Sequence, residues 1–147
     1  MKKTEMRGSA SKAVILAVSG SQADLSLLRC LFTGSSWELA TAESVAEARV
    51  WLQRNSAPLV LCERLLPDGD WKDLLAVVNR MEGPPRIIVT SRQADDELWI
   101  EALNFGAFDV LRLPARPSEV FSALSSAWRN WHQHNATPHR PAAFAAA

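Results

Sequence analysis

The chain is 147 residues long, which is close to the most common size of a single protein domain and long enough to bury a core. Hydrophobic residues make up 48% and charged residues 22%, so the composition is that of an ordinary globular protein, unusual only in having six Trp and no Tyr. Its 16 Lys and Arg balance its 16 Asp and Glu, and this neutrality gives no general electrostatic reason to expect nucleic acid or a membrane surface as a partner.

The two ends of the chain differ in composition from the middle. Residues 1–12 are polar and predict a flexible leader, and the apolar run that follows, 13–18, is too short for a signal peptide. No stretch approaches the roughly 18 apolar residues that span a bilayer, so we expect a cytoplasmic protein. Residues 132–147 lose periodicity and gain Pro and Ala, which predicts a disordered tail after one domain at 13–131.

Short apolar runs alternate with amphipathic segments along the chain. Capping residues support the helices: Ser21 and Ser44 each precede an acidic residue by three positions, Gly106 follows the fourth helix, and Pro117 opens the last. A Pro-Asp-Gly turn at 67–69 follows the third strand. In chain order, the pattern predicts strand 13–18, helix 22–32, strand 37–42, helix 44–53, strand 59–63, helix 71–81, strand 86–90, helix 95–105, strand 108–113 and helix 117–131.

This alternation predicts an α/β fold with a five-stranded parallel sheet covered by helices on both faces. In such doubly wound sheets, ligands bind at the carboxyl ends of the strands, near the point where the strand order reverses. The residues expected at that edge are 19–21, 63–64, 90–91 and 113–114.

Cysteine and histidine do not suggest a metal centre or a disulfide framework. Cys30 and Cys62 each lie in an apolar segment, and we expect both to be buried free thiols. His132, His134 and His139 lack accompanying Cys or carboxylate ligands, so no metal or other cofactor is expected.

Three segments together resemble the receiver domains of two-component response regulators, the CheY-like superfamily. They are LVLCERLLPDGDW at 59–71, PRIIVTS at 85–91 and ALNFGAFDVLRLPARPSEV at 102–120. The resemblance covers roughly residues 13–128 and implies the (βα)5 flavodoxin-like receiver fold, a role in phosphorelay signalling, and a phosphoryl-accepting site at the carboxyl edge of the sheet.

The same resemblance implies that this site is degenerate. Ser19 and Gly20 stand where the family has the acidic pair that holds Mg²⁺, and Glu63 stands at the phosphoacceptor Asp. Leu113 replaces the phosphate-binding Lys, whereas Thr90 keeps the switch hydroxyl. Without carboxylates for a divalent cation or a lysine to offset the anion, the cleft cannot stabilise a transferred phosphoryl group. We therefore expect a pseudo-receiver that is not an enzyme and has no catalytic residue.

Val110 replaces the family's aromatic switch residue, and Trp71 stands where Gly is usual and adds bulk beside the pocket. In receivers the fourth helix, fifth strand and fifth helix commonly form the signalling face, which here implies Trp99, Val110 and Trp128 as contact residues. The implied partner is a signalling protein, such as a histidine-kinase-type component, or a second copy of the chain.

Other interpretations remain open from the sequence. Glu63 could mimic a phosphorylated Asp with Thr90 as its hydrogen-bond donor, or it could be a strand-end carboxylate paired with Arg64 or Arg92. Residues 19–21, 90 and 91 could instead form a small pocket for an anion or metabolite. The chain could also retain residual phosphoacceptor activity.

Overall fold

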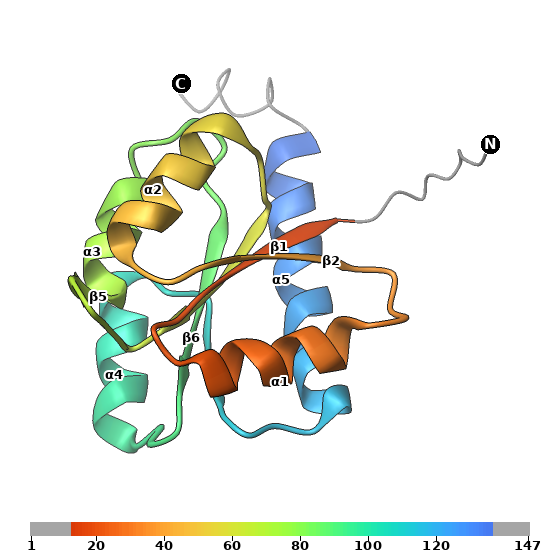
Figure 1. The fold of residues 1–147 in the computed structure, drawn as a ribbon. Coiled ribbons are helices and arrows are strands. Elements are labelled where there is room, and N and C mark those ends of the chain that lie inside the picture. The colour runs from red at the N-terminus through yellow and green to blue at the C-terminus, as the bar shows by residue number, and fades with distance from the viewer. Residues whose placement is uncertain (1–12, 137–147) are drawn as a thin grey trace.

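The structure, a computed structural model, describes residues 13–136 (Figure 1). The main sheet contains β1 (Val14–Val18), β2 (Glu38–Ala42), β3 (Leu59–Glu63), β6 (Arg86–Ser91) and β7 (Asp109–Arg112), and a small hairpin contains β4 (Leu65–Leu66) and β5 (Gly69–Asp70). The helices are α1 (Gln22–Phe32), α2 (Val45–Arg54), α3 (Trp71–Val78), α4 (Asp96–Phe105) and α5 (Pro117–Ala136).

The main sheet is parallel throughout, in the order β2-β1-β3-β6-β7. Helices α1 and α5 cover one face and α2, α3 and α4 cover the other, as Figure 1 shows. This arrangement confirms the doubly wound α/β fold that the alternation of elements predicts. The chain reverses its direction of winding between β1 and β3, so the carboxyl ends of these two strands form the switch point of the sheet.

Each face of the sheet carries its own buried core, because successive strand residues point to opposite faces. The first core includes Ala48, Leu52, Trp71, Leu74, Leu75, Val78, Leu98 and Ala102 from helices and Leu16, Val18, Val60, Cys62, Ile87, Val89 and Val110 from strands. The second core includes Leu25, Leu28, Phe32, Val120, Leu124 and Ala127 from helices and Ile15, Ala17, Leu59, Leu61, Ile88, Leu111 and Leu113 from the strands and their ends. Burial on both faces explains why the central strands are continuous apolar runs.

The predicted caps form. The Ser21 hydroxyl accepts a hydrogen bond from the Asp24 amide at 3.1 Å, and Gly106 ends α4 with a φ of +98°, a left-handed conformation that suits glycine. Asp68, in the β4–β5 turn, adds a cap from outside α2: its carboxylate accepts from the amides of Val45 at 2.8 Å and Ala46 at 3.0 Å. The turn is thereby tied to the start of α2.

Two sequence-based expectations about where helices end are wrong in detail. Helix α3 ends at Val78 and not Met81. The backbone amides of Arg80 and Met81 donate to the carbonyls three residues earlier, as in turns, and not to those four residues earlier. The predicted tail from His132 is helical as far as Ala136. The His132 ring stacks on Trp128, and the side-chain amide of Asn135 donates to the Trp131 carbonyl. Residues 1–12 and 137–147 lie outside the described residues.

Cys62 is buried as expected, but Cys30 is exposed. It follows Arg29 on the solvent side of α1, off the stripe formed by Leu25, Leu28 and Phe32. The β4–β5 hairpin was not predicted beyond its turn. Within residues 13–136, no helix combines the length and the apolar character needed to cross a membrane.

The Asp68 cap generates a pH prediction. The hydrogen bonds from the Val45 and Ala46 amides hold the pKa of Asp68 below its ordinary 3.8. Because the folded-state pKa lies below the unfolded one, the stabilisation is complete above pH 3.8 and is lost as the pH falls through the lower folded value. Asp68→Asn should lower the melting temperature by a few degrees at neutral pH and flatten its decline in acid, as measured by circular dichroism.

Glu38→Gln is the matched control, because Glu38 is an exposed carboxylate on the edge strand β2. An acid melting curve of Asp68→Asn that parallels the wild type would show that Asp68 does not support the start of α2.

Candidate functional site

The polar residues at the switch point lie on one face of the sheet. Ser19 and Glu63 continue the alternation of Ile15 and Ala17 in β1 and of Leu59 and Leu61 in β3, and these four residues belong to the second core. Thr90 lies opposite Glu63 in the register of β3 and β6. The fold therefore brings Ser19, Glu63 and Thr90 to the same edge, on the side covered by α1 and α5.

A hydrogen bond joins the two central strands at this edge. The Ser19 hydroxyl donates to Oε1 of Glu63 at 2.7 Å and accepts from the Ser21 amide at 3.0 Å. Ser19 is only 3% exposed, whereas Glu63 is partly exposed. A buried hydroxyl is thus used as both donor and acceptor, and the partly exposed carboxylate has a neutral partner within hydrogen-bond distance.

Thr90 does not make the contact with Glu63 that one interpretation of the sequence required. The residue is 3% exposed, and its hydroxyl has no hydrogen-bond partner among residues 13–136. Its carbonyl accepts from the Arg64 amide at 2.9 Å. The hydroxyl that reaches Glu63 comes from Ser19 on the neighbouring strand instead.

The ion pair at this edge also differs from the expectation. Arg92, which follows β6, pairs with Asp24 in the first turn of α1. Among residues 13–136, neither Arg92 nor Arg64 forms a salt bridge with Glu63. The Asp24 side chain is 4% exposed and that of Arg92 is 53% exposed. Since an unpaired buried carboxylate is costly, this pair fastens the segment after β6 to the start of α1.

Two further residues of the expected site, Leu113 and Gly20, make packing contacts. Leu113 is 2% exposed and belongs to the second core, so its side chain is buried with apolar neighbours. Gly20 lies against Pro67: a Cβ at residue 20 would stand 3.0 Å from the Pro67 ring. A larger side chain at residue 20 would therefore require Pro67 to move.

The space at this edge is a cleft of about 230 Å³ lined by Glu63, Arg64, Leu65, Ser91 and Gln93. Of the residues predicted for a small polar pocket, only Ser91 lines it; Ser19 and Thr90 are buried below the surface, and residues 20 and 21 lie outside the lining. Trp71 is not part of this lining either. It is 1% exposed in the first core, and its ring meets that of Phe105 edge-on at 6.1 Å.

Chemistry by a thiol or a metal finds little support in the described residues. Burial, with the charges of Glu63 and Asp70, raises the pKa of the Cys62 thiol, which keeps the thiol protonated and poorly nucleophilic. Residues 13–136 contain no group of three or more His, Cys, Asp or Glu side chains placed to hold a metal ion, and His139 lies outside the described residues.

Only part of the expected interaction face is exposed to solvent. Val110 is 5% exposed and belongs to the same buried core as Leu98 and Ala102 of α4, so its assignment as a contact residue is wrong. Trp128 is partly buried against the second core and stacks on His132 at 4.6 Å. Trp99 is 39% exposed.

Two residues beside Trp99 were missed by the sequence analysis. Ile100 is 60% and Leu103 is 66% exposed, and with Trp99 they form an apolar stripe along the outer side of α4, which we call the α4 stripe. The sequence held a signal for them: once Leu98 and Ala102 are assigned to the core, the helical period places Ile100 and Leu103 on the opposite side.

Residues 15–125 match the response regulator receiver domain family. The chain belongs to this family. Solved structures agree: a CheY-like receiver domain protein from Methanospirillum hungatei is 21% identical with a TM-score of 0.75, covering 85% of this chain and all of that one. The receiver domain of an HD domain-containing protein from Pseudomonas fluorescens is 25% identical with the same TM-score, covering 83% and 98%.

Curated relatives of this receiver domain are longer proteins. The transcriptional regulatory protein DpiA of Escherichia coli is 31% identical over 77 residues, covering 52% of this chain and 34% of DpiA. KdpE of Staphylococcus aureus, also a transcriptional regulatory protein, is 25% identical over 123 residues, covering 84% of this chain and 53% of KdpE. The chain thus matches about a third to a half of the length of these regulators.

The Asp24–Arg92 pair generates a stability prediction for the receiver domain. Arg92→Ala leaves the buried Asp24 carboxylate without its cation and should lower the free energy of unfolding by about 2 kcal/mol, a buried-pair value reduced because Arg92 is half exposed. Urea denaturation followed by Trp fluorescence measures the change.

Arg112→Ala is the matched control, since Arg112 is an exposed arginine at the end of β7. Asp24→Asn in the Arg92→Ala background should recover part of the loss. If Arg92→Ala and Arg112→Ala unfold at the same urea concentration, the pair contributes nothing measurable.

Proposed function

We propose that this chain acts in two-component signalling as a phosphorylation-independent interaction module. The observation that carries the proposal is the hydrogen bond from the Ser19 hydroxyl to the Glu63 carboxylate at the switch point. At the position where the resemblance implies a phosphoacceptor beside two metal-binding carboxylates, this chain has one carboxylate with a neutral partner.

Electrostatics supports this interpretation. Phosphoryl transfer to a carboxylate brings several negative oxygens together, and it depends on a divalent cation and a lysine to offset their charge. The residues at 19 and 20 offer no carboxylate for the cation, and Leu113 is packed in the second core. Glu63 is also poorly supported as a phosphate mimic, because Ser19 and not Thr90 supplies its hydrogen bond.

Sensing of a small ligand in the vacated cleft is less well supported. The cleft of about 230 Å³ is smaller than the roughly 300–1,000 Å³ usual for ligand pockets. The hydroxyls of Ser19 and Ser91 already have partners, since Ser91 accepts a hydrogen bond from the Gln93 amide at 3.0 Å. Output through a protein contact fits the described residues better.

The surface with the strongest claim to such a contact is the α4 stripe. Its three apolar side chains are exposed side by side, and aromatic and large apolar residues are typical of the centre of protein interfaces. The protein partner is a second copy of the chain or a signalling protein such as a histidine-kinase-type component, in a cytoplasmic setting. Nothing in the neutral charge balance favours nucleic acid or a membrane.

The first prediction of this proposal concerns phosphoryl transfer. Incubation with Mg²⁺ and a small acyl phosphate donor should leave the intact mass of the chain unchanged, because residues 19 and 20 supply no carboxylate for the cation and residue 113 is not a lysine. A receiver domain that accepts phosphoryl groups, treated in parallel, verifies that the donor is active. A stable mass increase of one phosphoryl group that disappears in Glu63→Gln would contradict the proposal.

The second prediction concerns the α4 stripe. Replacing Ile100 and Leu103 by Ser should abolish self-association in sedimentation equilibrium or capture of the cognate kinase component, with an unchanged circular dichroism spectrum. Trp99→Ala should weaken the same contact by roughly tenfold or more, as large aromatic residues at interface centres do.

Val50→Ser is the matched control, because Val50 is 47% exposed on α2, away from the stripe. Association that is unaffected by the α4 substitutions, or reduced equally by Val50→Ser, would exclude this surface.

A further inference from the structure

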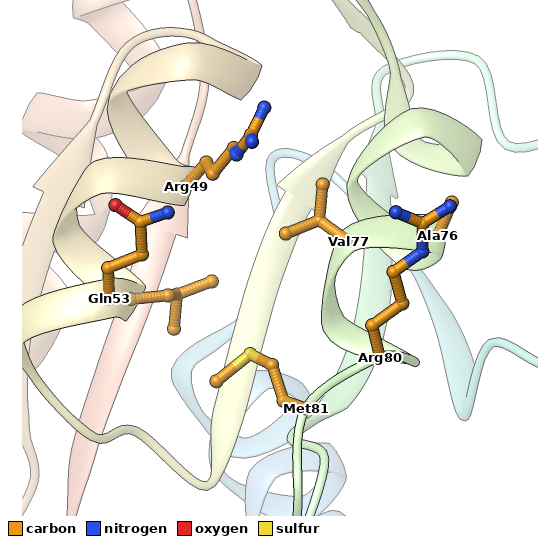
Figure 2. Close-up of a pocket in the computed structure, with 7 residues that line it drawn as sticks. Arg49, Gln53, Ala76, Val77, Arg80 and Met81 are labelled. Atoms are coloured by element: carbon orange, nitrogen blue, oxygen red, sulfur yellow. The ribbon is translucent and has the colours of Figure 1, made fainter.

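A second cleft lies between α2 and the end of α3, on the opposite side of the sheet from the second core. Its volume is about 390 Å³, within the range usual for small-molecule pockets. In parallel βα units the helices run back toward the amino ends of the strands, so this cleft lies away from the edge that holds Glu63. Figure 2 shows side chains from both helices facing it.

The floor of the cleft is apolar. Leu52 is 5% exposed in the first core, and Val77 and Met81 are partly buried against that core. The polarizable thioether of Met81 adapts to aromatic and irregular apolar groups. The apolar part of a ligand can therefore be buried here, away from water, without requiring the helices to move.

The walls are cationic. Arg49 on α2 and Arg80 just after α3 line opposite sides, and the lining contains no acidic residue (Figure 2). Among residues 13–136, neither guanidinium has a hydrogen bond or ion pair. A guanidinium presents a planar set of donors that matches a carboxylate with two parallel hydrogen bonds. Gln53 adds a side-chain amide on the α2 wall.

We propose that this cleft is a binding site for a small organic carboxylate with an apolar body. The two features select different parts of one molecule: the floor of Leu52, Val77 and Met81 accepts the apolar body, and Arg49 and Arg80 accept the carboxylate. At about 30 Å³ for each water-sized group, the cleft holds a body of about a dozen non-hydrogen atoms. This site uses none of the α4 stripe residues, so it goes beyond the proposed function and stands independently of it.

Phenylbutyrate is a suitable probe, because it joins an aromatic body to a carboxylate through a short chain. In an NMR titration it should shift the signals of Leu52, Val77 and Met81 and saturate with a Kd of about 0.1–1 mM, the range expected for a ligand of this size. Phenylbutanol, which lacks the charge, should bind about tenfold more weakly, and acetate, which lacks the body, should not saturate.

The arginine variants test the assignment directly. Arg49→Gln and Arg80→Gln should each weaken phenylbutyrate binding about tenfold, since each removes a charge-assisted contact. Arg54→Gln is the matched control, because Arg54 is an exposed arginine on α2 that does not line the cleft. All three positions are exposed, so the variants should keep the circular dichroism spectrum of the wild type.

The proposal is overturned if phenylbutyrate shifts only α4 signals, if phenylbutanol binds as tightly, or if both cleft arginines can be replaced without effect. Binding of an acidic protein segment in this cleft without binding of phenylbutyrate would also overturn it. None of these results bears on the phosphoryl-transfer or α4 experiments, which involve other residues.

Discussion

The burial of β1 and β3 on both faces is the constraint on which the rest of the structure depends. Side chains in the middle of these strands belong to one core or the other, and a polar group placed there would lose its water without a partner. Polar side chains can enter only where the strands end. Ser19 and Glu63 occupy the carboxyl ends of the two strands, and because those strands are neighbours, the hydroxyl of one reaches the carboxylate of the other. The polar contact at the switch point is therefore a consequence of how the sheet is built.

The charged groups around this edge are arranged by the same constraint, that a buried polar group needs a partner. A partly exposed Glu63 needs no cation when a neutral hydroxyl donates to it. The buried carboxylate nearby is Asp24, and the cation that compensates it is Arg92 from the segment after β6. Opposite charges thus meet between α1 and that segment, while Leu113 is packed among apolar side chains. An incoming phosphoryl group would meet Glu63 and Arg64 in the cleft, but no pair of carboxylates to hold a divalent cation and no lysine at residue 113. This is the physical basis for proposing a module that works by contact.

The sequence predicted the elements well where local rules decide them. The bounds of α1 and β3 agree with the apolar runs and the Ser21 cap, because periodicity and capping depend on near neighbours. The partners at the site were harder to predict. The choice of Ser19 over Thr90 as donor to Glu63 depends on how adjacent strands are placed in space, and sequence spacing carries no such information. Val110 was misassigned for a related reason: β7 is an edge strand, but α4 covers one side of it.

Helix α3 physically connects the two surfaces to which we assign binding. Its last turn and the residues after it form one wall of the cationic cleft, and its first turn contacts α4. Lys72 pairs with Glu101 at 2.9 Å and lies 5.2 Å from the centre of the Phe105 ring, and the ion pair raises the pKa of Lys72, which keeps the ammonium charged. Trp71 packs edge-on against the same Phe105 ring. The first turn of α3 and the last two turns of α4 are therefore held together by an ion pair and an aromatic cluster, and a displacement of α3 that breaks neither contact must carry α4 with it.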